Sequence, residues 1–155
     1  GTPAASPPAG SAVADLPAMA AAHQLTVDTD LTYTAASRPA VGVYGAVDGS
    51  DDYWHSAIAA HAAPPGTHYD LGLPSSQQVT GIGLTLKPGY HESARVYLSA
   101  DGTNWGCPVA AADQLQTGQA AWFQLANPVN ARHVRVEVTS SEGWAMLTEL
   151  RLALS

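Results

Sequence analysis

Hydrophobic and polar residues alternate with a period of two in several short segments of this chain. In "HVRVEV", Val134, Val136 and Val138 would share one face of a strand, with polar residues on the other face. Similar runs rich in β-branched and aromatic residues are separated by Gly, Pro, Asn and Asp, which favour turns. The predicted strands are Leu31–Ala36, Thr67–Gly72, Gln78–Leu86, Ala94–Ser99, Ala121–Ala126, His133–Thr139 and Met146–Leu154.

The spacing of these segments predicts an all-β fold. No stretch beyond Leu25 combines helical periodicity with helix caps, so crossover helices for a parallel sheet have no room. We therefore expect an antiparallel β-sandwich of the jelly-roll type. A chain of 155 residues with 46% apolar content can bury one substantial core, which predicts a single domain.

Residues 1–24 differ in composition from the rest. This segment is rich in Pro, Ala, Gly and Ser and has few large apolar residues. We expect a linker or leader without core of its own, whose loss costs little stability, followed by the sandwich over residues 25–155. We call residues 1–24 the leader.

The segment "YLSADGTNWGCPVA", Tyr97–Ala110, has strand-like runs on both sides of Asp101-Gly102. Asp-Gly favours the positive φ angles of a tight hairpin turn, and Trp105 can cover the end of the sheet with its large apolar ring. The pattern indicates a structural hairpin rather than a chemical site.

Charge and cysteine content exclude several classes of function. The net charge is −7 and only 6 Lys and Arg are present, without a basic cluster, so binding to nucleic acid or an anionic membrane surface is disfavoured. No apolar stretch is long enough to span a bilayer. Because Cys107 is the single cysteine, an intrachain disulfide and a multi-cysteine metal site are excluded.

The sequence offers little support for catalysis. Ser56, His55 and Asp70 are triad residue types, but no Gly-x-Ser-x-Gly motif accompanies them. The histidines lack the spacing of a zinc motif. We expect a protein that is not an enzyme.

The acidic loop "DGSDD" places Asp48, Asp51 and Asp52 close together, with Ser50 between them. Such carboxylates repel one another, and a hard cation with oxygen ligands relieves the repulsion. The alternative is a solvated acidic turn.

Aromatic and polar residues also gather in loops between the predicted strands. Sugars are recognised by aromatic rings that cover their C–H faces and by polar side chains that bond their hydroxyls, commonly on loops at one end of a β-sandwich. The loop candidates are Tyr44, His55, His61, Lys87, Tyr90, His91 and Trp144.

An ordered set of segments resembles the discoidin-type domains, also called coagulation-factor type C domains, which overlap the family 32 carbohydrate-binding modules. The segments are "AVDGSDDYWHS", "HYDLGLPSSQQVTGIGL", "ARVYLSADGTNWGCPVA", "ARHVRVEV" and "LTELRL". The residue pattern of these segments is most similar to that of the galactose-binding domains attached to bacterial sialidases and to galactose oxidase. The resemblance implies a jelly-roll sandwich of roughly eight strands and no oxidase or sialidase activity.

The resemblance also implies two sites. The family binds calcium in the loop that contains Asp48 and with a glutamate near the end of the chain, here Glu149. Ser50 takes a further ligand position, backbone carbonyls of Gly45 and Thr148 can contribute, and Asp51 or Asp52 would replace a missing threonine. Such a structural Ca²⁺ would tie the loop to the last strand.

For the sugar site, His55 matches a family histidine, and Lys87 stands where relatives carry arginine. Lysine offers one point donor instead of a planar fork, and Ile58 replaces a family aromatic, so the location of the site is better supported than galactose as its sugar. Glu92 would supply an acid, and Tyr90, His91 or Trp144 the aromatic face.

These observations together predict a non-catalytic carbohydrate-binding module. We expect it to target an attached catalytic domain of a larger secreted, bacterial, glycan-active enzyme. The alternative is an adhesion domain that binds protein or lipid surfaces, and an independent hydrolase would need an acid pair that we cannot place.

Overall fold

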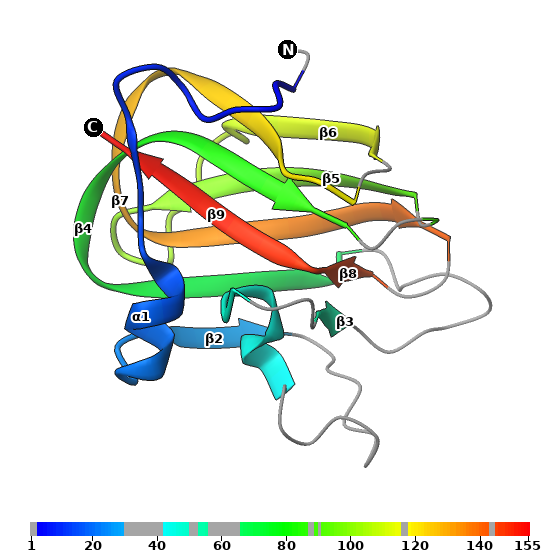
Figure 1. Ribbon diagram of the computed structural model, residues 1–155, viewed down its shortest axis with the longest axis horizontal. Helices are drawn as coiled ribbons and strands as arrows, with labels where there is room; N and C mark the ends of the chain where they lie inside the picture. The colour runs from blue at the N-terminus through cyan, green and yellow to red at the C-terminus, as the bar shows by residue number, and fades with distance from the viewer. Residues whose placement is uncertain are drawn as a thin grey trace.

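The computed structural model describes residues 3–29, 42–49, 53–55, 66–86, 89, 91–115, 118–142 and 145–155, with His55 described by its backbone. The strands are β1 (Ala12–Val13), β2 (Thr26–Thr29), β3 (Trp54–His55), β4 (His68–Thr85), β5 (Glu92–Ser99), β6 (Ala110–Leu115), β7 (Ala121–Ser141), β8 (Met146–Leu147) and β9 (Glu149–Leu154). A helix, α1 (Leu16–Ala21), and a 3₁₀ turn, η1 (Gly42–Ala46), complete the described elements. The expected all-β antiparallel fold is confirmed (Figure 1).

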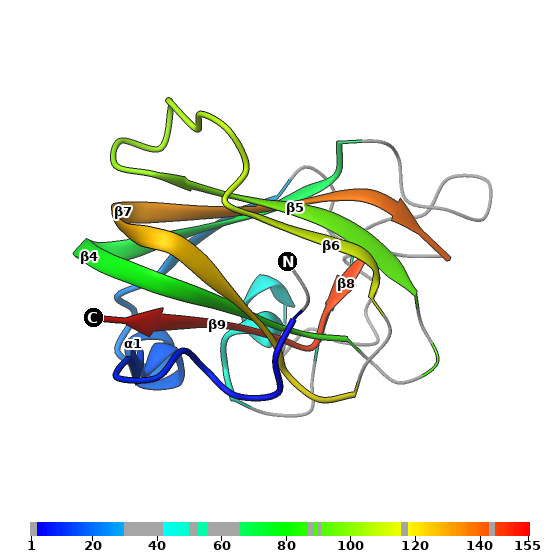
Figure 2. The same cartoon turned by 90° about the horizontal axis from the view of Figure 1, so that it is seen from above.

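Two long strands hold the fold together. The main sheet has the order β1-β9-β4-β7-β5-β6, β2 also pairs with β4, and a second sheet joins β3 to β8. The first half of β4 pairs with the second half of β7, and the register shifts between Gly72 and Gln77 and between Val79 and Gly81 before pairing resumes. These irregularities let both strands bend and serve both layers (Figure 2).

The predicted strands agree with this architecture, with differences at their ends. Thr67–Gly72 and Gln78–Leu86 fall within one bent strand, β4, and Ala121–Ala126 and His133–Thr139 within another, β7. The sequence pattern missed β1, β2 and β3, and of β6 it included only the first residue, Ala110. The predicted strand Leu31–Ala36 lies outside the described residues.

The core lies between the two layers. Val134, Val136 and Val138 are buried, as their alternation predicted. Tyr69 packs edge-on against Trp54, with ring centroids 5.1 Å apart, which joins β4 to the short strand β3. In the part of the chain that the structure describes, no helix has the length and hydrophobicity that crossing a membrane requires.

The leader packs on the sandwich, which corrects the expectation that it contributes no core. Ala4 exchanges two backbone hydrogen bonds with Trp122, each 2.8 Å, and β1 pairs antiparallel with β9. The Asp15 side chain caps α1 by accepting from the Ala18 amide, and Leu16 in the first turn is only 1% exposed. In Figure 1 this segment passes the end of β9 and reaches α1 beside β2.

The Asp101-Gly102 segment also differs from the expected tight turn. Strand β5 ends at Ser99 and β6 begins at Ala110, so a longer loop connects the hairpin. The Asp101 carboxylate accepts hydrogen bonds from the amides of Thr103 and Asn104, which lower the pKa of this exposed carboxyl, and Gly102 has φ 78°. The loop is closed by local hydrogen bonds of the Asx type.

Trp105 covers an ion pair rather than the end of the sheet. The Arg135 Cζ atom lies 4.4 Å from the centroid of the Trp105 ring. Arg135 also donates two hydrogen bonds to the Asp70 carboxylate, at 2.8 and 2.7 Å. Bidentate pairing and cation–π contact both fix the orientation of a guanidinium. These contacts hold the loop against the face of the sheet, which is what a structural hairpin requires.

Candidate functional sites

The described segments that carry His55, His91 and Glu92 lie at one end of the sandwich. Strand β3, which carries His55, pairs with β8, and His55 lies opposite Met146. The end of β4, the start of β5 and the end of β7 meet the same region, at the right of Figure 1. Lys87 and Tyr90 come in the connection after β4, and Trp144 comes just before β8; these three lie outside the described residues.

Glu92 is in this region, but its carboxylate faces the interior. The residue is 3% exposed, and its Oε1 atom accepts a 2.7 Å hydrogen bond from the Met146 amide. Burial raises the pKa of Glu92 to about 8, against the lowering effect of that hydrogen bond. A side chain this enclosed does not reach an external sugar, which differs from the expected contact role, and it holds β8 in position beside His55.

His91 lies at the surface next to Glu92. Its Nδ1 atom is 2.9 Å from Glu142 Oε2, and the side chains of the two residues are 33% and 64% exposed. The Glu142 amide also donates a 3.2 Å hydrogen bond to the His91 carbonyl. This exposed pair ties the start of β5 to the end of β7, and the His91 ring remains accessible at the edge of the candidate sugar site.

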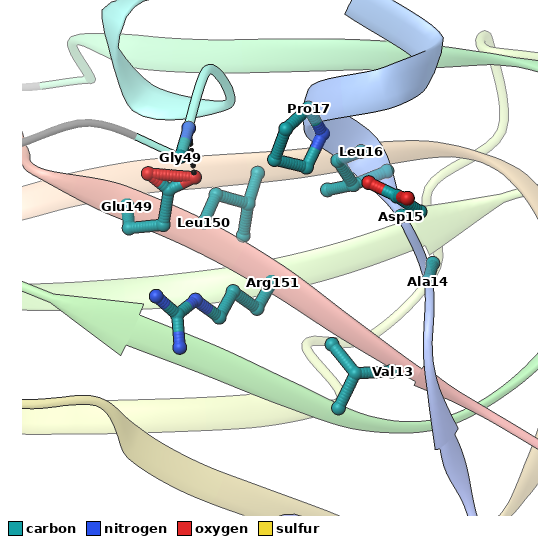
Figure 3. Close-up of a pocket in the computed structure, with 9 residues that line it drawn as sticks. All are labelled: Val13, Ala14, Asp15, Leu16, Pro17, Gly49, Glu149, Leu150 and Arg151. Carbon is teal, nitrogen blue, oxygen red and sulfur yellow. Dashed lines mark hydrogen bonds between the residues drawn. The ribbon is translucent and has the colours of Figure 1, made fainter.

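The predicted cation site lies where the acidic loop meets β9. Glu149 Oε1 accepts a 3.1 Å hydrogen bond from the Gly49 amide, as Figure 3 shows. Glu149 Oε2 and Thr148 Oγ1 are both buried, and neither has a hydrogen-bond partner among the described residues. Buried polar atoms are nearly always satisfied, so unsatisfied oxygen atoms on two consecutive residues are consistent with a hard cation as the missing partner.

The surroundings of the acidic loop change the pKa of Glu149. Burial raises the pKa of Glu149 to about 7, the Gly49 hydrogen bond and Arg151 oppose that rise, and Asp48 adds to it. Of the other expected ligands, Gly45 is buried, while Ser50, Asp51 and Asp52 lie outside the described residues. Within the described ranges, no three His, Cys, Asp or Glu side chains are grouped closely enough to hold a metal.

The fold defines the class of protein, a jelly-roll β-sandwich of antiparallel strands. The chain belongs to the F5/8 type C domain family, whose model matches residues 26–150. This family corresponds to the one that the sequence segments resemble.

Comparisons with individual proteins agree with this family. The chain is 32% identical over 120 residues to galactose oxidase from Gibberella zeae, an alignment that covers 69% of this chain and 17% of that protein. The chain therefore spans less than a fifth of the length of this curated relative.

Solved structures share the fold at lower identity. The family 32 module of NanJ from C. perfringens, solved in complex with galactose, has a TM-score of 0.67 at 15% identity, covering 83% of this chain and 93% of that one. The family 32 module of AlyQ, solved with 4,5-unsaturated mannuronic acid, has a TM-score of 0.65 at 16% identity, covering 82% and 92%.

Sequence reasoning missed two features that surround these sites. The positioning role of Glu92 had no local signal, because nothing near "HESAR" indicates that its carboxylate turns inward onto Met146. The docking of the leader did have a local sequence signal. Asp15 followed by Leu16 and Pro17 is typical of the start of a helix, with a large apolar residue at the first helical position.

Proposed function

We propose that this chain is a non-catalytic carbohydrate-binding module. The observation that carries the proposal is its membership of the F5/8 type C family. A fold shared with modules solved with galactose and with an unsaturated mannuronic acid supports it. Open loop sites of this kind make few hydrogen bonds, each partly offset by lost hydration, so we expect weak binding to single sugars and avidity toward polymers.

The module is proposed to direct a larger secreted, glycan-active enzyme to its substrate. The relative with 32% identity is an oxidase in which the matched region makes up 17% of the length. An accessory domain of this size fits such an arrangement, because weak affinity in one domain raises the local concentration of substrate for another. Galactose-type sugars are the first candidates, since galactose is the ligand solved in the NanJ module.

The sugar site is proposed to use His55, which lies in β3, and Lys87, which follows β4 in the sequence and lies outside the described residues. Lys87→Ala removes a charged donor to hydroxyl groups and is expected to weaken glycan binding at least tenfold, or ~1.5 kcal/mol. His55→Ala is expected to act in the same direction. Titration with galactose and with a galactose-containing polysaccharide measures both effects.

The matched control is Arg95→Ala, which removes one cation from a partly exposed pair with Asp113 on the sheet. This variant should bind glycans as tightly as the unmodified chain does, because it changes the net charge by the same amount as Lys87→Ala and leaves the strand ends intact. Full affinity in both His55→Ala and Lys87→Ala would refute the site. Binding to phosphatidylserine vesicles in place of glycans would favour the adhesion alternative.

We further propose that the loop around Asp48 holds a structural calcium ion together with Glu149. The two buried oxygen atoms of Glu149 and Thr148 that lack hydrogen-bond partners support this proposal, because calcium prefers oxygen ligands. The ion would offset the repulsion of the acidic loop and link it to β9.

Calcium should therefore raise the thermal midpoint. At a concentration 100 times its Kd, the ion would stabilise the folded state by about 2.7 kcal/mol. Differential scanning calorimetry with chelator and with excess calcium measures the shift. Glu149→Gln should remove the response and Glu137→Gln, on the sheet, should keep it; an identical midpoint with chelator and calcium would contradict the proposal.

A further inference from the structure

A recess lies between the leader and the acidic loop. Its volume is about 380 Å³, within the range of small-ligand sites. The lining residues are Pro17, Ala20, Ala21, His23, Leu25, Tyr44 and Asp48. All of these residues except Tyr44 and Asp48 precede the family match, which begins at residue 26. We call this recess the leader groove.

Tyr44 gives the leader groove an exposed aromatic face. The residue is 41% exposed, which is unusual for a large apolar side chain in this structure. Its hydroxyl donates a 3.2 Å hydrogen bond to the carbonyl of Leu25, a residue that is 3% exposed. The ring is therefore held by its far end to the core, and a rigid ring costs little entropy when a ligand packs on it.

Two polar side chains border the same groove. Asp48 provides a carboxylate at the loop side, and His23 provides an imidazole from the leader. His23 has φ 57°, a left-handed conformation that is uncommon for residues other than glycine. The His23 amide donates to the Ala20 carbonyl at 3.1 Å and the Gln24 amide donates to the Met19 carbonyl at 2.9 Å, so hydrogen bonds fix this turn.

Pro17 fixes the wall of the leader groove. A Cβ atom on Gly49 would lie 3.0 Å from Pro17 Cγ, so α1 packs directly on the acidic loop, and the glycine is needed there. Figure 3 shows a neighbouring recess, whose lining includes Asp15, Pro17, Gly49, Glu149 and Arg151. The groove is thus formed by packed elements on both sides.

The lining chemistry indicates one class of ligand. A flat aromatic ring suits the C–H face of a sugar, and the His23 imidazole can bond its hydroxyls. No Lys or Arg lines the groove among the described residues, and the chain carries a net charge of −7, which disfavours an acidic sugar. We propose that the leader groove is a second carbohydrate site that binds a neutral pyranose against Tyr44, a ligand class that rests on the proposed function.

Amide NMR titration of the whole chain tests this proposal. The probes are galactose, glucose and N-acetylgalactosamine, each added separately, with mannuronic acid as the acidic comparison. At least one neutral sugar should shift the amides of residues 20–25 and 44–48, and mannuronic acid should not. The absence of such shifts with all three neutral sugars would overturn the proposal.

Two variants of Tyr44 distinguish the contribution of its ring to sugar binding from that of its hydroxyl. Tyr44→Phe loses the bond to Leu25 but keeps the aromatic face, so its affinity should stay within about threefold of the unmodified chain. Tyr44→Ala should weaken binding at least tenfold. Equal affinity in both variants would overturn the assignment of the ring.

Two leader variants keep the test valid if Tyr44→Ala does not fold. His23→Gly removes the imidazole at a position where glycine is unstrained, and Ala21→Trp fills the groove from the exposed side of α1. Both should fold and lose the shifts at residues 44–48. Retention of those shifts in Ala21→Trp would contradict the proposal.

The two sugar sites can be judged separately. In a His55→Ala, Lys87→Ala double variant, shifts at the leader groove should persist while polysaccharide binding weakens. Loss of both sets of shifts in this double variant would mean that the leader groove is not a separate site. Shifts at the strand ends without any at the groove would refute the groove and leave the proposed function intact.

Discussion

Leu16→Ala is expected to lower the free energy of unfolding by about 3 kcal/mol. The Leu16 side chain is 1% exposed and belongs to the core, although it lies in the leader, outside the family match. Its removal leaves a cavity beneath α1, which the paired segment around β1 cannot easily collapse to fill. Urea unfolding followed by tryptophan fluorescence measures the loss.

Val13→Ala is the matched control, because Val13 lies in the same leader but is 46% exposed. This variant should change stability by less than about 0.5 kcal/mol. Deletion of residues 1–24 should destabilise the chain more than Leu16→Ala does, since it also removes the pairing of β1 with β9 and of Ala4 with Trp122. A truncated chain as stable as the full chain would show that the leader does not dock in solution.

Glu92→Gln is expected to stabilise the protein at alkaline pH and to flatten its pH dependence. The buried carboxyl has a folded-state pKa of about 8, compared with an ordinary value of 4.5. The glutamine carbonyl can still accept the hydrogen bond from the Met146 amide, so β8 keeps its position. The variant therefore removes the ionisable group without removing the contact.

The direction follows from proton binding in the two states. Between pH 4.5 and pH 8, folded Glu92 holds its proton and the unfolded chain has released it. Because the folded state binds more protons, stability falls as pH rises through this window. We expect the difference between the chain and its Glu92→Gln variant to change by about 2–4 kcal/mol over that range.

Chemical unfolding at a series of pH values measures this difference. Glu137→Gln, on the pairing strand β7 and only half-buried, is the control for the loss of one carboxyl group. If Glu92→Gln and the unmodified chain lose stability in parallel as pH rises, the Glu92 carboxyl is not the titrating group. The substitution should also leave sugar affinity unchanged, because the side chain faces the interior and positions β8 without contacting the sugar.

Local residue pattern was sufficient to predict the architecture. A period of two places every second side chain on one face, so Val134, Val136 and Val138 identified the core face of β7 without any long-range information. The predicted β-sandwich follows from short alternating runs and turn residues. The sequence also predicted a sugar site at His55 and Lys87; Lys87 lies outside the described residues, and this site stays a prediction.

Features that depend on distant residues were decided only by the tertiary structure. The buried Glu92 carboxylate accepts a hydrogen bond from the amide of Met146, 54 residues away, and no local pattern specifies that contact. The leader looked like a linker because its single large core residue, Leu16, becomes buried only when α1 meets the sandwich. The leader groove arises in the same way: Tyr44 acquires a fixed ring, and Asp48 and His23 acquire a common recess, only when the leader packs beside the acidic loop. Hydrophobic periodicity determines which face of an element is buried, whereas the partner of that face depends on contacts across the whole chain.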